Sequence, residues 1–479
     1  ILIRPEHAVQ WTISAVPVVD TLLEDTAMAR ELGHAASLID ERQYLTALEQ
    51  LGKIESGHPE KPLALCLSGL IRLIVNDSGR AMQDIQSALE MDPDNPAAHL
   101  IHAYLLQGRL KLDAAMASTQ TALSLNPGYT AAQLNLARLY FAIDETERSR
   151  SQVDFILEQH PGHAEALTLK GFLLLATLNT DASVPMFERA VRSNHLSGEP
   201  HLGLALAFMR QGNVQKAFEQ ITTAVLLEPQ RSLFLSYWAK MLYESKRFEQ
   251  ALDILELAAR LDTNDPTPHL YRSHIFRDLN RHHESIHAME TAVSLNDNRA
   301  VYRSRMLMDR DLAVKNVNLA LTYKQLGVSE WGQLKAMASL KQDTTNFAAH
   351  NFLAGQLEYL QGYNSYPARS ARLRAFLMQP ANLNTLNTFN DYTSFLEKPD
   401  IGGTLAAYAG NNGYLDKELE IHGALPHLNT SYSFKIETFD YDGWQAHDRE
   451  ESTLFESSFK WDISHRDTLS LNMHYLDTD

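Results

Sequence analysis

The stretch PAAHLIHAYLLQGRLKLDAAMASTQTALSLNPGY (residues 96–129) decides the fold, because its landmarks recur every 34 residues over most of the chain. Its Pro127 follows a polar residue and shares one register with four other prolines: Pro59, Pro93, Pro161 and Pro229. Other residues fill the remaining places of that register: His195, Thr263 and Asp297. Proline stops a helix, because it lacks the backbone N–H and its ring clashes with the preceding turn. The period is therefore one of helix ends.

Small residues occupy further fixed positions of the same period. With the stop at position 32, eight 34-residue units cover residues 28–299, and positions 8, 20 and 27 are mostly Ala, Gly or Ser. In the quoted unit these are Ala103, Ala115 and Ala122. Small side chains let the two helices of a hairpin approach closely, and the whole pattern resembles the tetratricopeptide repeat. The resemblance implies helical hairpins that stack into a superhelical solenoid.

The period slips once, after the eighth unit. Taking Thr344 as the next stop leaves residues 300–312 as an insertion, and residues 313–380 then hold two further units that end at Pro380. We therefore expect a mainly α-helical array of about ten hairpins. The insertion has two interpretations, which are a docking or hinge element and part of a longer helix that caps an irregular repeat.

The composition disfavours several classes of protein. A net charge of −17 argues against a nucleic-acid binder, because phosphate contacts need a basic surface. The one cysteine, Cys66, cannot form an internal disulfide, and no run of 18 or more apolar residues predicts a transmembrane helix. Residues 1–20 show no signal-peptide pattern, so we expect a chain that continues upstream or has been processed.

The first helix of each unit is expected to line a concave groove, as the resemblance implies, with the second helix on the outer wall. Positions 2, 5, 9 and 12 of the first helix would then face a protein or polymer ligand. The candidate groove residues bring aromatic and basic side chains into an acidic protein: Tyr104, Gln107, Arg138, Phe141, Phe172, Met209, Lys240, Tyr243, His274 and Arg277. A solvated wall without a ligand is the alternative interpretation, because every solenoid has such a surface.

One motif suggests metal chemistry. The run HESIH (residues 283–287) matches the HExxH pattern, in which two histidines on one helix face share a zinc ion and the glutamate acts as a base. Ser285 stands at the small position 20, however, so the repeat already explains this helix, and no third ligand is recognisable nearby. We therefore expect no metal, no cofactor and no catalytic residue.

The pattern changes after Pro380. Residues 381–400 have no helical stripe and are expected to form a linker. Over residues 401–479 apolar and polar side chains alternate, which predicts antiparallel strands with one apolar face. Strands near ten residues long, with connections that run long, short, long, short, fit the start of a truncated outer-membrane barrel. A soluble amphipathic sheet gives the same alternation.

Three segments outside the repeats resemble one bacterial family. RPEHAVQW (residues 4–11) lies in a connector expected over residues 1–27, and residues 301–327 follow the eighth unit. GALPHLNTSYSFKIETFDYDGW (residues 423–444) and SHRDTLSLNMHYLDTD (residues 464–479) lie among the strands. Together they resemble proteins in which a FecR-like domain precedes tetratricopeptide repeats and a C-terminal outer-membrane barrel.

The resemblance implies a location and a role. We expect a non-enzymatic scaffold at the Gram-negative outer membrane, with its repeats in the periplasm holding a partner and its strands in the barrel. Such proteins act in export, secretion or cell-surface assembly, with an exopolysaccharide as a candidate cargo. The alternative is a soluble protein–protein interaction scaffold with a small C-terminal β-domain.

Overall fold

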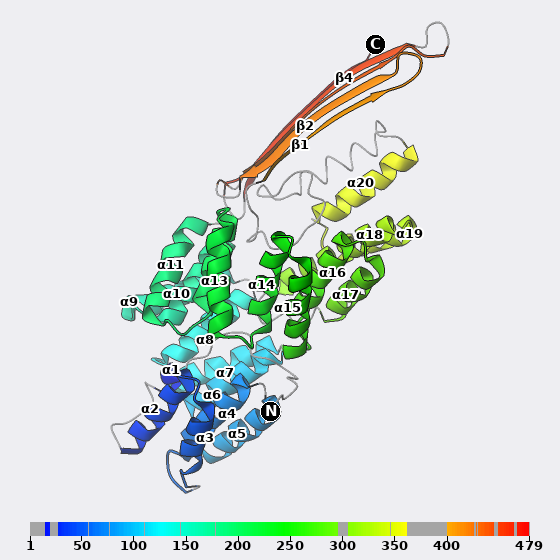
Figure 1. Cartoon of the computed structure of the whole chain (residues 1–479). Helices are drawn as coiled ribbons and strands as arrows, with labels where there is room; N and C mark the ends of the chain where they lie inside the picture. Colours follow the sequence, from blue (N-terminus) through cyan, green and yellow to red (C-terminus); the bar gives the residue numbers. More distant parts are fainter. Residues whose placement is uncertain are drawn as a thin grey trace. The chain divides into compact units, whose positions relative to one another are not determined.

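The computed structural model of the chain describes residues 15–19, 27–55, 57–75, 77–109, 111–143, 145–177, 179–295, 305–344, 346–361, 400–425, 428, 430–444, 449–463 and 467–478. All described helices precede all described strands (Figure 1). Two compact units divide the chain. The first comprises residues 1–173, 185–203 and 220–309, and the second comprises residues 174–184, 204–219 and 310–479.

Helices follow one another in pairs after the short α1 (Val16–Val19). The first helices of the pairs are α2 (Ala27–Asp40), α4 (Lys61–Ile74), α6 (Pro96–Gly108), α8 (Thr130–Ala142), α10 (Ala164–Ala176), α12 (Glu199–Arg210), α14 (Ser232–Glu244), α16 (Thr267–Asp278), α18 (Arg305–Gln325) and α20 (Phe347–Gln361). The second helices are α3 (Tyr44–Gly52), α5 (Ser78–Met91), α7 (Leu112–Leu125), α9 (Thr146–Gln159), α11 (Thr180–Ser193), α13 (Val214–Leu227), α15 (Phe248–Leu261), α17 (His282–Ser294) and α19 (Ser329–Gln342).

Four prolines of the 34-residue register stand two residues beyond the second helices, as the sequence predicts, whereas Pro59 stands seven residues beyond the end of α3. Helix α5 ends two residues before Pro93, and α7 ends two residues before Pro127. A capping residue then begins the first helix of the next pair. Asn95, for example, accepts hydrogen bonds from the N–H groups of Ala97 and Ala98 at 3.1 and 3.2 Å. Such a cap satisfies donors that a helix start leaves without partners.

The small positions 8 and 20 lie where the helices of a pair touch. Ala103 and Ala115 are fully buried between α6 and α7. Where position 20 is serine, the approach is close enough for its hydroxyl to reach the facing backbone, and Ser149 Oγ donates to the carbonyl oxygen of Ala137 at 2.8 Å. A β-carbon on Gly171, at position 8, would lie 2.5 Å from the Phe187 ring. Small residues are therefore a steric requirement of the crossing.

The insertion expected at residues 300–312 is partly helical. Residues 296–304 lie outside the described part, but from Arg305 the chain is already in α18, which continues to Gln325. A helix longer than its neighbours was one of the two interpretations of this stretch. The second helix expected for the tenth unit and the linker at 381–400 lie almost wholly outside the described residues. No helix in the described part of the chain is long and apolar enough to span a membrane.

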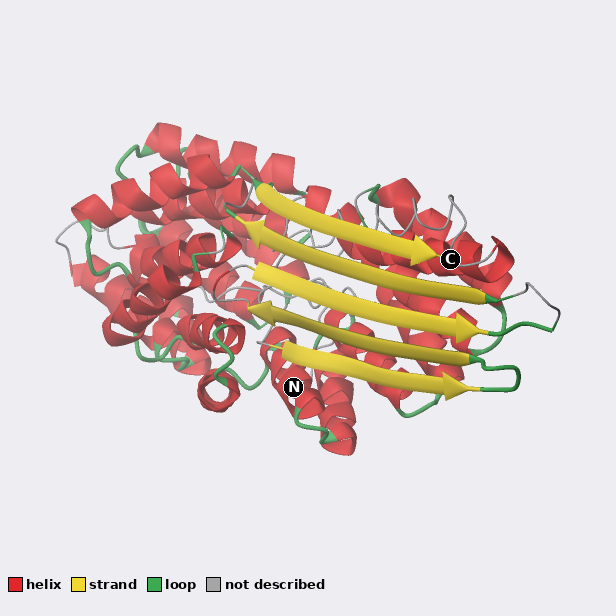
Figure 2. Ribbon diagram, turned by 90° about the horizontal axis from the view of Figure 1, so that it is seen from above, coloured by secondary structure: helices red, strands yellow, loops and turns green. Residues whose placement is uncertain are grey.

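The strands form one antiparallel sheet in sequence order (Figure 2). They are β1 (Asp400–Ala409), β2 (Leu415–Leu425), β3 (Thr430–Tyr441), β4 (Glu450–Asp462) and β5 (Thr468–Thr478). The pairing register runs straight across the sheet, for example from Tyr432 to Phe459 and on to Leu471. Strands β1 and β5 are the edges, so the sheet is open and is not closed into a barrel.

The register sorts the side chains onto two faces of opposite character. One face, called the apolar face below, carries the following side chains: Ile401, Leu405, Leu419, Ile421, Tyr432, Phe434, Ile436, Phe455, Phe459, Trp461, Leu469, Leu471, Met473 and Tyr475. The other face, the polar face, carries His422, Glu420, Glu418, Ser433, Lys435, Glu437, Ser458, Glu456, Lys460, Asn472, His474 and Ser470. The alternation read from the sequence therefore gives the faces for the residues that it covers, whereas near the connection of residues 442–449 the side chains of Phe439, Leu454 and Leu476 lie on the polar face.

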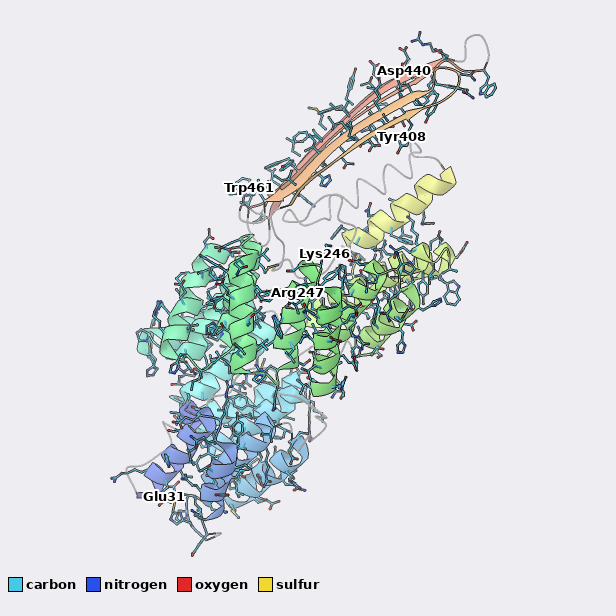
Figure 3. The ribbon with its side chains drawn as sticks, in the orientation of Figure 1. Glu31, Lys246, Arg247, Tyr408, Asp440 and Trp461 are labelled. Carbon is cyan, nitrogen blue, oxygen red and sulfur yellow. The ribbon has the colours of Figure 1, made fainter. Side chains whose placement is uncertain are left out.

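The connections only partly follow the expected order of long, short, long, short. They comprise residues 410–414, 426–429, 442–449 and 463–467, so only the third is clearly longer than the rest. Aromatic residues do lie at both ends of the sheet, since Trp461 is near the end opposite to Tyr408 (Figure 3). Tyr475 is an exception, because it lies within β5 opposite Phe455 and away from the strand end.

The helix crossing at positions 8 and 20 gives a stability prediction. Ala115→Leu should lower the free energy of unfolding by about 1–3 kcal/mol, because the larger side chain cannot fit between α6 and α7. Ala117 is exposed on the same helix, so Ala117→Leu should change it by less than about 0.5 kcal/mol. Denaturant unfolding measures both. Equal losses in the two variants would contradict the register.

Candidate functional site

The ten candidate groove residues all lie on first helices, from α6 to α16. Six of them are buried: Tyr104, Gln107, Met209, Lys240, His274 and Arg277. The other four are half-buried: Arg138, Phe141, Phe172 and Tyr243. Arg138, Phe141, Phe172 and Tyr243 therefore keep part of their surface open to solvent, whereas the buried six do not. Their side chains pack or bond within the array, which the position rule did not anticipate.

Gln107 serves contacts between repeats. Its Nε2 donates to Oδ1 of Asn135 at 2.8 Å, which joins α6 to α8. Asn135 Nδ2 donates in turn to Thr119 Oγ1 at 2.9 Å, and Thr119 Oγ1 donates to the Ala115 carbonyl oxygen. Buried polar groups stabilise a fold only when they are bonded in this way. Gln107 thus uses one N–H of its amide to join two repeats.

Four candidate residues meet between α14 and α16. Tyr243 donates its hydroxyl proton to Asp278 Oδ2 at 2.6 Å, and burial together with this carboxylate raises the pKa of Tyr243. Lys240 Nζ lies 3.4 Å from a Glu244 carboxylate oxygen and 5.5 Å from the centre of the Tyr271 ring.

The other two candidates complete this cluster. The ring of His274 lies 6.5 Å from the Tyr271 ring, and Arg277 Nε lies 3.9 Å from Asp278. The sequence rule therefore brings Lys240, Tyr243, His274 and Arg277 together. Their charges are balanced by acids on the same helices.

The first four repeats hold a different occupant, the chain's own segment Ala15–Val19. The N–H groups of Ala15 and Val16 donate to the two carboxylate oxygens of Asp40, at 2.5 and 3.2 Å. At the other end, Tyr129 donates its hydroxyl proton to the Val18 carbonyl oxygen at 2.5 Å. This segment includes α1, which packs on α2 and α8, the first helices of the first and fourth repeats (Figure 1).

Arg42 makes a second long-range contact within the same unit. It lies in the turn between α2 and α3, and its guanidinium donates to the Leu196 carbonyl oxygen at 2.9 Å. It also lies 3.7 Å from Glu228, which lies 3.4 Å from Arg231. Arg231 in turn lies 4.0 Å from Glu199, whose pKa is raised by burial. The first repeat thus contacts the turns that follow α11 and α13.

Sequence reasoning missed Asp40, Tyr129 and Arg42. Tyr129 stands at the last position of its unit, where no groove residue was expected. Asp40 is the last residue of α2, and Arg42 lies in the turn that follows it. One signal was available, because AVPVV (residues 15–19) is an apolar run ahead of the first repeat. Of the connector expected over residues 1–27, the structure describes residues 15–19 and residue 27.

The HExxH motif lies on α17 with both histidines exposed. Ser285 between them is buried, and its Oγ donates to the carbonyl oxygen of Ser273 at 2.8 Å. Within the described residues, no group of three or more His, Cys, Asp or Glu side chains could hold a metal ion. The helix is therefore explained by its place in the repeat.

Comparison with known families finds tetratricopeptide repeats at residues 111–173, and again at 173–231 and 202–266. Among solved structures, the Cut9–Hcn1 hetero-tetramer of the APC/C aligns over 74% of this chain and 81% of its own, with a TM-score of 0.50 at 14% identity. Tetratricopeptide repeats are therefore shown at residues 111–266, and the wider helical array has a fold similar to that of Cut9–Hcn1. An identity this low shows the fold of the repeats and nothing of their partners.

Two further proteins are similar to parts of this chain. A stretch of 64 residues is 33% identical to cell division cycle protein 27 homolog A of Arabidopsis thaliana. That stretch is 13% of this chain and 9% of the relative, so the chain spans less than a tenth of the relative's length. A tetratricopeptide repeat protein from Parabacteroides merdae is 19% identical, with a TM-score of 0.39 over 55% of this chain and 98% of its own.

Asp40 gives a pH prediction. Burial raises the pKa of Asp40 to about 6, and the charge of Glu165 adds to the rise. The two N–H bonds lower this pKa but do not cancel the effect of burial. A folded-state pKa above the ordinary value stabilises the fold below about pH 4, and this stabilisation is lost as the pH rises through about 6. Between pH 7.5 and pH 5 the wild type should therefore gain about 1 kcal/mol over Asp40→Asn. Denaturant unfolding at both pH values measures this, and parallel profiles would contradict a buried carboxylate.

Proposed function

We propose that this chain is a non-enzymatic tetratricopeptide-repeat scaffold that holds a periplasmic partner and is anchored to the Gram-negative outer membrane through β1–β5. Its role would be export, secretion or cell-surface assembly, with an exopolysaccharide as a candidate cargo. The repeats are compatible with binding a protein partner. The observation that carries the membrane part of the proposal is the way in which the sheet exposes its side chains.

Large apolar side chains of the sheet are exposed. Leu471 is 68% exposed and Met473 is 59% exposed, and both lie on the apolar face. On the polar face, by contrast, Lys460 is only 2% exposed and His422 is 7% exposed. A sheet in water normally buries its apolar face, since each Å² of apolar surface left in water costs about 25 cal/mol. Hydrocarbon in place of water removes that cost.

The polar face is bonded across the strands. Lys435 Nζ lies 3.5 Å from Glu418 on β2 and 2.9 Å from Glu437 on its own strand. His474 Nδ1 and Glu456 Oε1 are 3.0 Å apart between β5 and β4. A transmembrane barrel has an apolar exterior and a polar interior of this kind. The polar face would therefore line the interior.

Strand length and the open edges fit the same proposal. The strands have 10 to 13 residues, against about 9–11 for a tilted crossing of the hydrocarbon core. Unpaired backbone groups at an edge are costly in lipid, so β1 and β5 would need further strands beside them. We propose that these come from the same protein or from further copies of it.

A pair of adjacent substitutions tests the anchoring. Leu471→Arg should prevent assembly into the membrane, because a charge facing the lipid midplane costs roughly 2–4 kcal/mol. Asn472→Arg, one residue further and on the polar face, should be tolerated. The measurement is the amount of protein in the outer-membrane fraction that resists salt and alkaline carbonate.

The same fractionation separates the two candidate functions. Release of the wild type by carbonate without detergent would overturn the membrane proposal and leave the soluble interaction scaffold with a small sheet. Equal behaviour of the two arginine variants would show that the faces are assigned wrongly.

A further inference from the structure

The segment Ala15–Val19 is held in the way that a bound peptide is held. Its backbone is hydrogen-bonded at both ends. Two of its N–H groups donate to Asp40, and the Val18 carbonyl oxygen accepts from Tyr129, which is 111 residues away. A helix of four residues does not persist alone, because helix nucleation is unfavourable. Its conformation is therefore imposed by the site.

The side chains of the segment divide sharply into buried and outward ones. Ala15, Val18 and Val19 are at most 1% exposed, whereas Val16 is 36% exposed. The buried three belong to one apolar cluster with side chains of the first four repeats, among them Leu32, Leu70, Tyr104 and Ala132. A small number of apolar anchors in fully desolvated places is what gives peptide recognition most of its affinity.

The segment is also separate from the repeat framework. Residues 20–26 lie between it and α2, and its described hydrogen bonds outside itself go to Asp40 and Tyr129. The repeats on either side keep their own pairings, such as α4 with α5 and α6 with α7. A removable occupant of this kind differs from a helix on which the solenoid depends.

We propose that Ala15–Val19 is an internal ligand of the first four repeats, and that the same site takes a short, valine-rich apolar segment of a partner protein when the internal one leaves. This inference rests on the proposal that the array captures a protein partner. We infer the chemistry of the partner segment from the internal one. The internal segment has two N–H groups that donate to Asp40, a carbonyl that accepts from Tyr129 and two buried valines.

The internal segment would control access to the site. A tethered ligand acts at a high effective concentration, commonly in the millimolar range for short linkers, so a free peptide cannot compete with it easily. The segment is hydrogen-bonded to the Asp40 carboxylate, and burial of a carboxylate is unfavourable. This cost limits how tightly the segment is bound. Partner binding would then require displacement of residues 15–19.

Cys66 is a built-in reporter of displacement. It is the one cysteine of the chain, and it is fully buried in the apolar cluster that also holds Val18, Val19 and Tyr129. Burial raises the pKa of the Cys66 thiol, so it reacts slowly while it is covered. Its rate of labelling in the full chain therefore measures how often the site opens.

The test compares matched substitutions on the two sides of α1. Val18→Asn places an amide at a buried position, and Val16→Asn places the same amide at an outward one. In the full chain, Val18→Asn should raise the rate of Cys66 labelling at least tenfold, and Val16→Asn should leave it near the wild-type value. A fluorescent peptide of residues 13–20 should bind to the Val18→Asn chain, slow its labelling again, and bind the wild type at least tenfold more weakly.

Tyr129→Phe provides a second variant that keeps the ring and removes only the bond to Val18. Tyr129→Phe alone should raise the rate of Cys66 labelling several-fold. Combined with Val18→Asn, it should weaken binding of the peptide to the chain several-fold. Wild-type labelling rates in both Val18→Asn and Tyr129→Phe would overturn the proposal. Faster labelling without binding or protection by the peptide would also overturn it, because α1 would then be a structural cap. Carbonate fractionation of the same variants reports the proposed membrane anchoring separately.

Discussion

The close approach of two helices at positions 8 and 20 is the constraint on which the array depends. Where the side chains there are Ala, Gly or Ser, the backbones come near enough for Ser149 to bond the carbonyl oxygen of Ala137. The crossing is tight enough that Phe187 fits only against glycine, because a β-carbon at Gly171 or Gly203 would overlap its ring. Repetition of this crossing every 34 residues turns a local steric rule into the whole helical framework.

The framework presents two kinds of surface along its first helices. In the first four repeats that surface is apolar and is occupied by residues 15–19. Asp40 and Tyr129 form hydrogen bonds with the backbone of these residues. Further along, α14 and α16 gather Lys240, Tyr243 and Arg277, whose charges are balanced by neighbouring acids. One array could therefore hold an apolar segment at one place and a polar one at another.

Local rules predicted much of this structure, and contacts between distant repeats were beyond them. The proline register placed the helix ends, and the alternation at Phe459, Leu471 and their neighbours placed the two faces of the sheet, because both depend on spacing within a few residues. The hydrogen bond between Tyr129 and Val18 depends on how several repeats stack, and no short stretch of sequence holds that information. The bond from Gln107 to Asn135 between two repeats was not predicted for the same reason.

The sheet exposes large apolar side chains such as Leu471 and Met473, and the proposed bilayer would cover them. Spin labels placed singly at positions 469 to 475, in a chain whose Cys66 is replaced by Ala, test this claim most directly. In the membrane, labels at 469, 471, 473 and 475 should be accessible to oxygen, and those at 470, 472 and 474 to a water-soluble nickel complex. Equal access of the nickel complex to all seven positions would contradict the account.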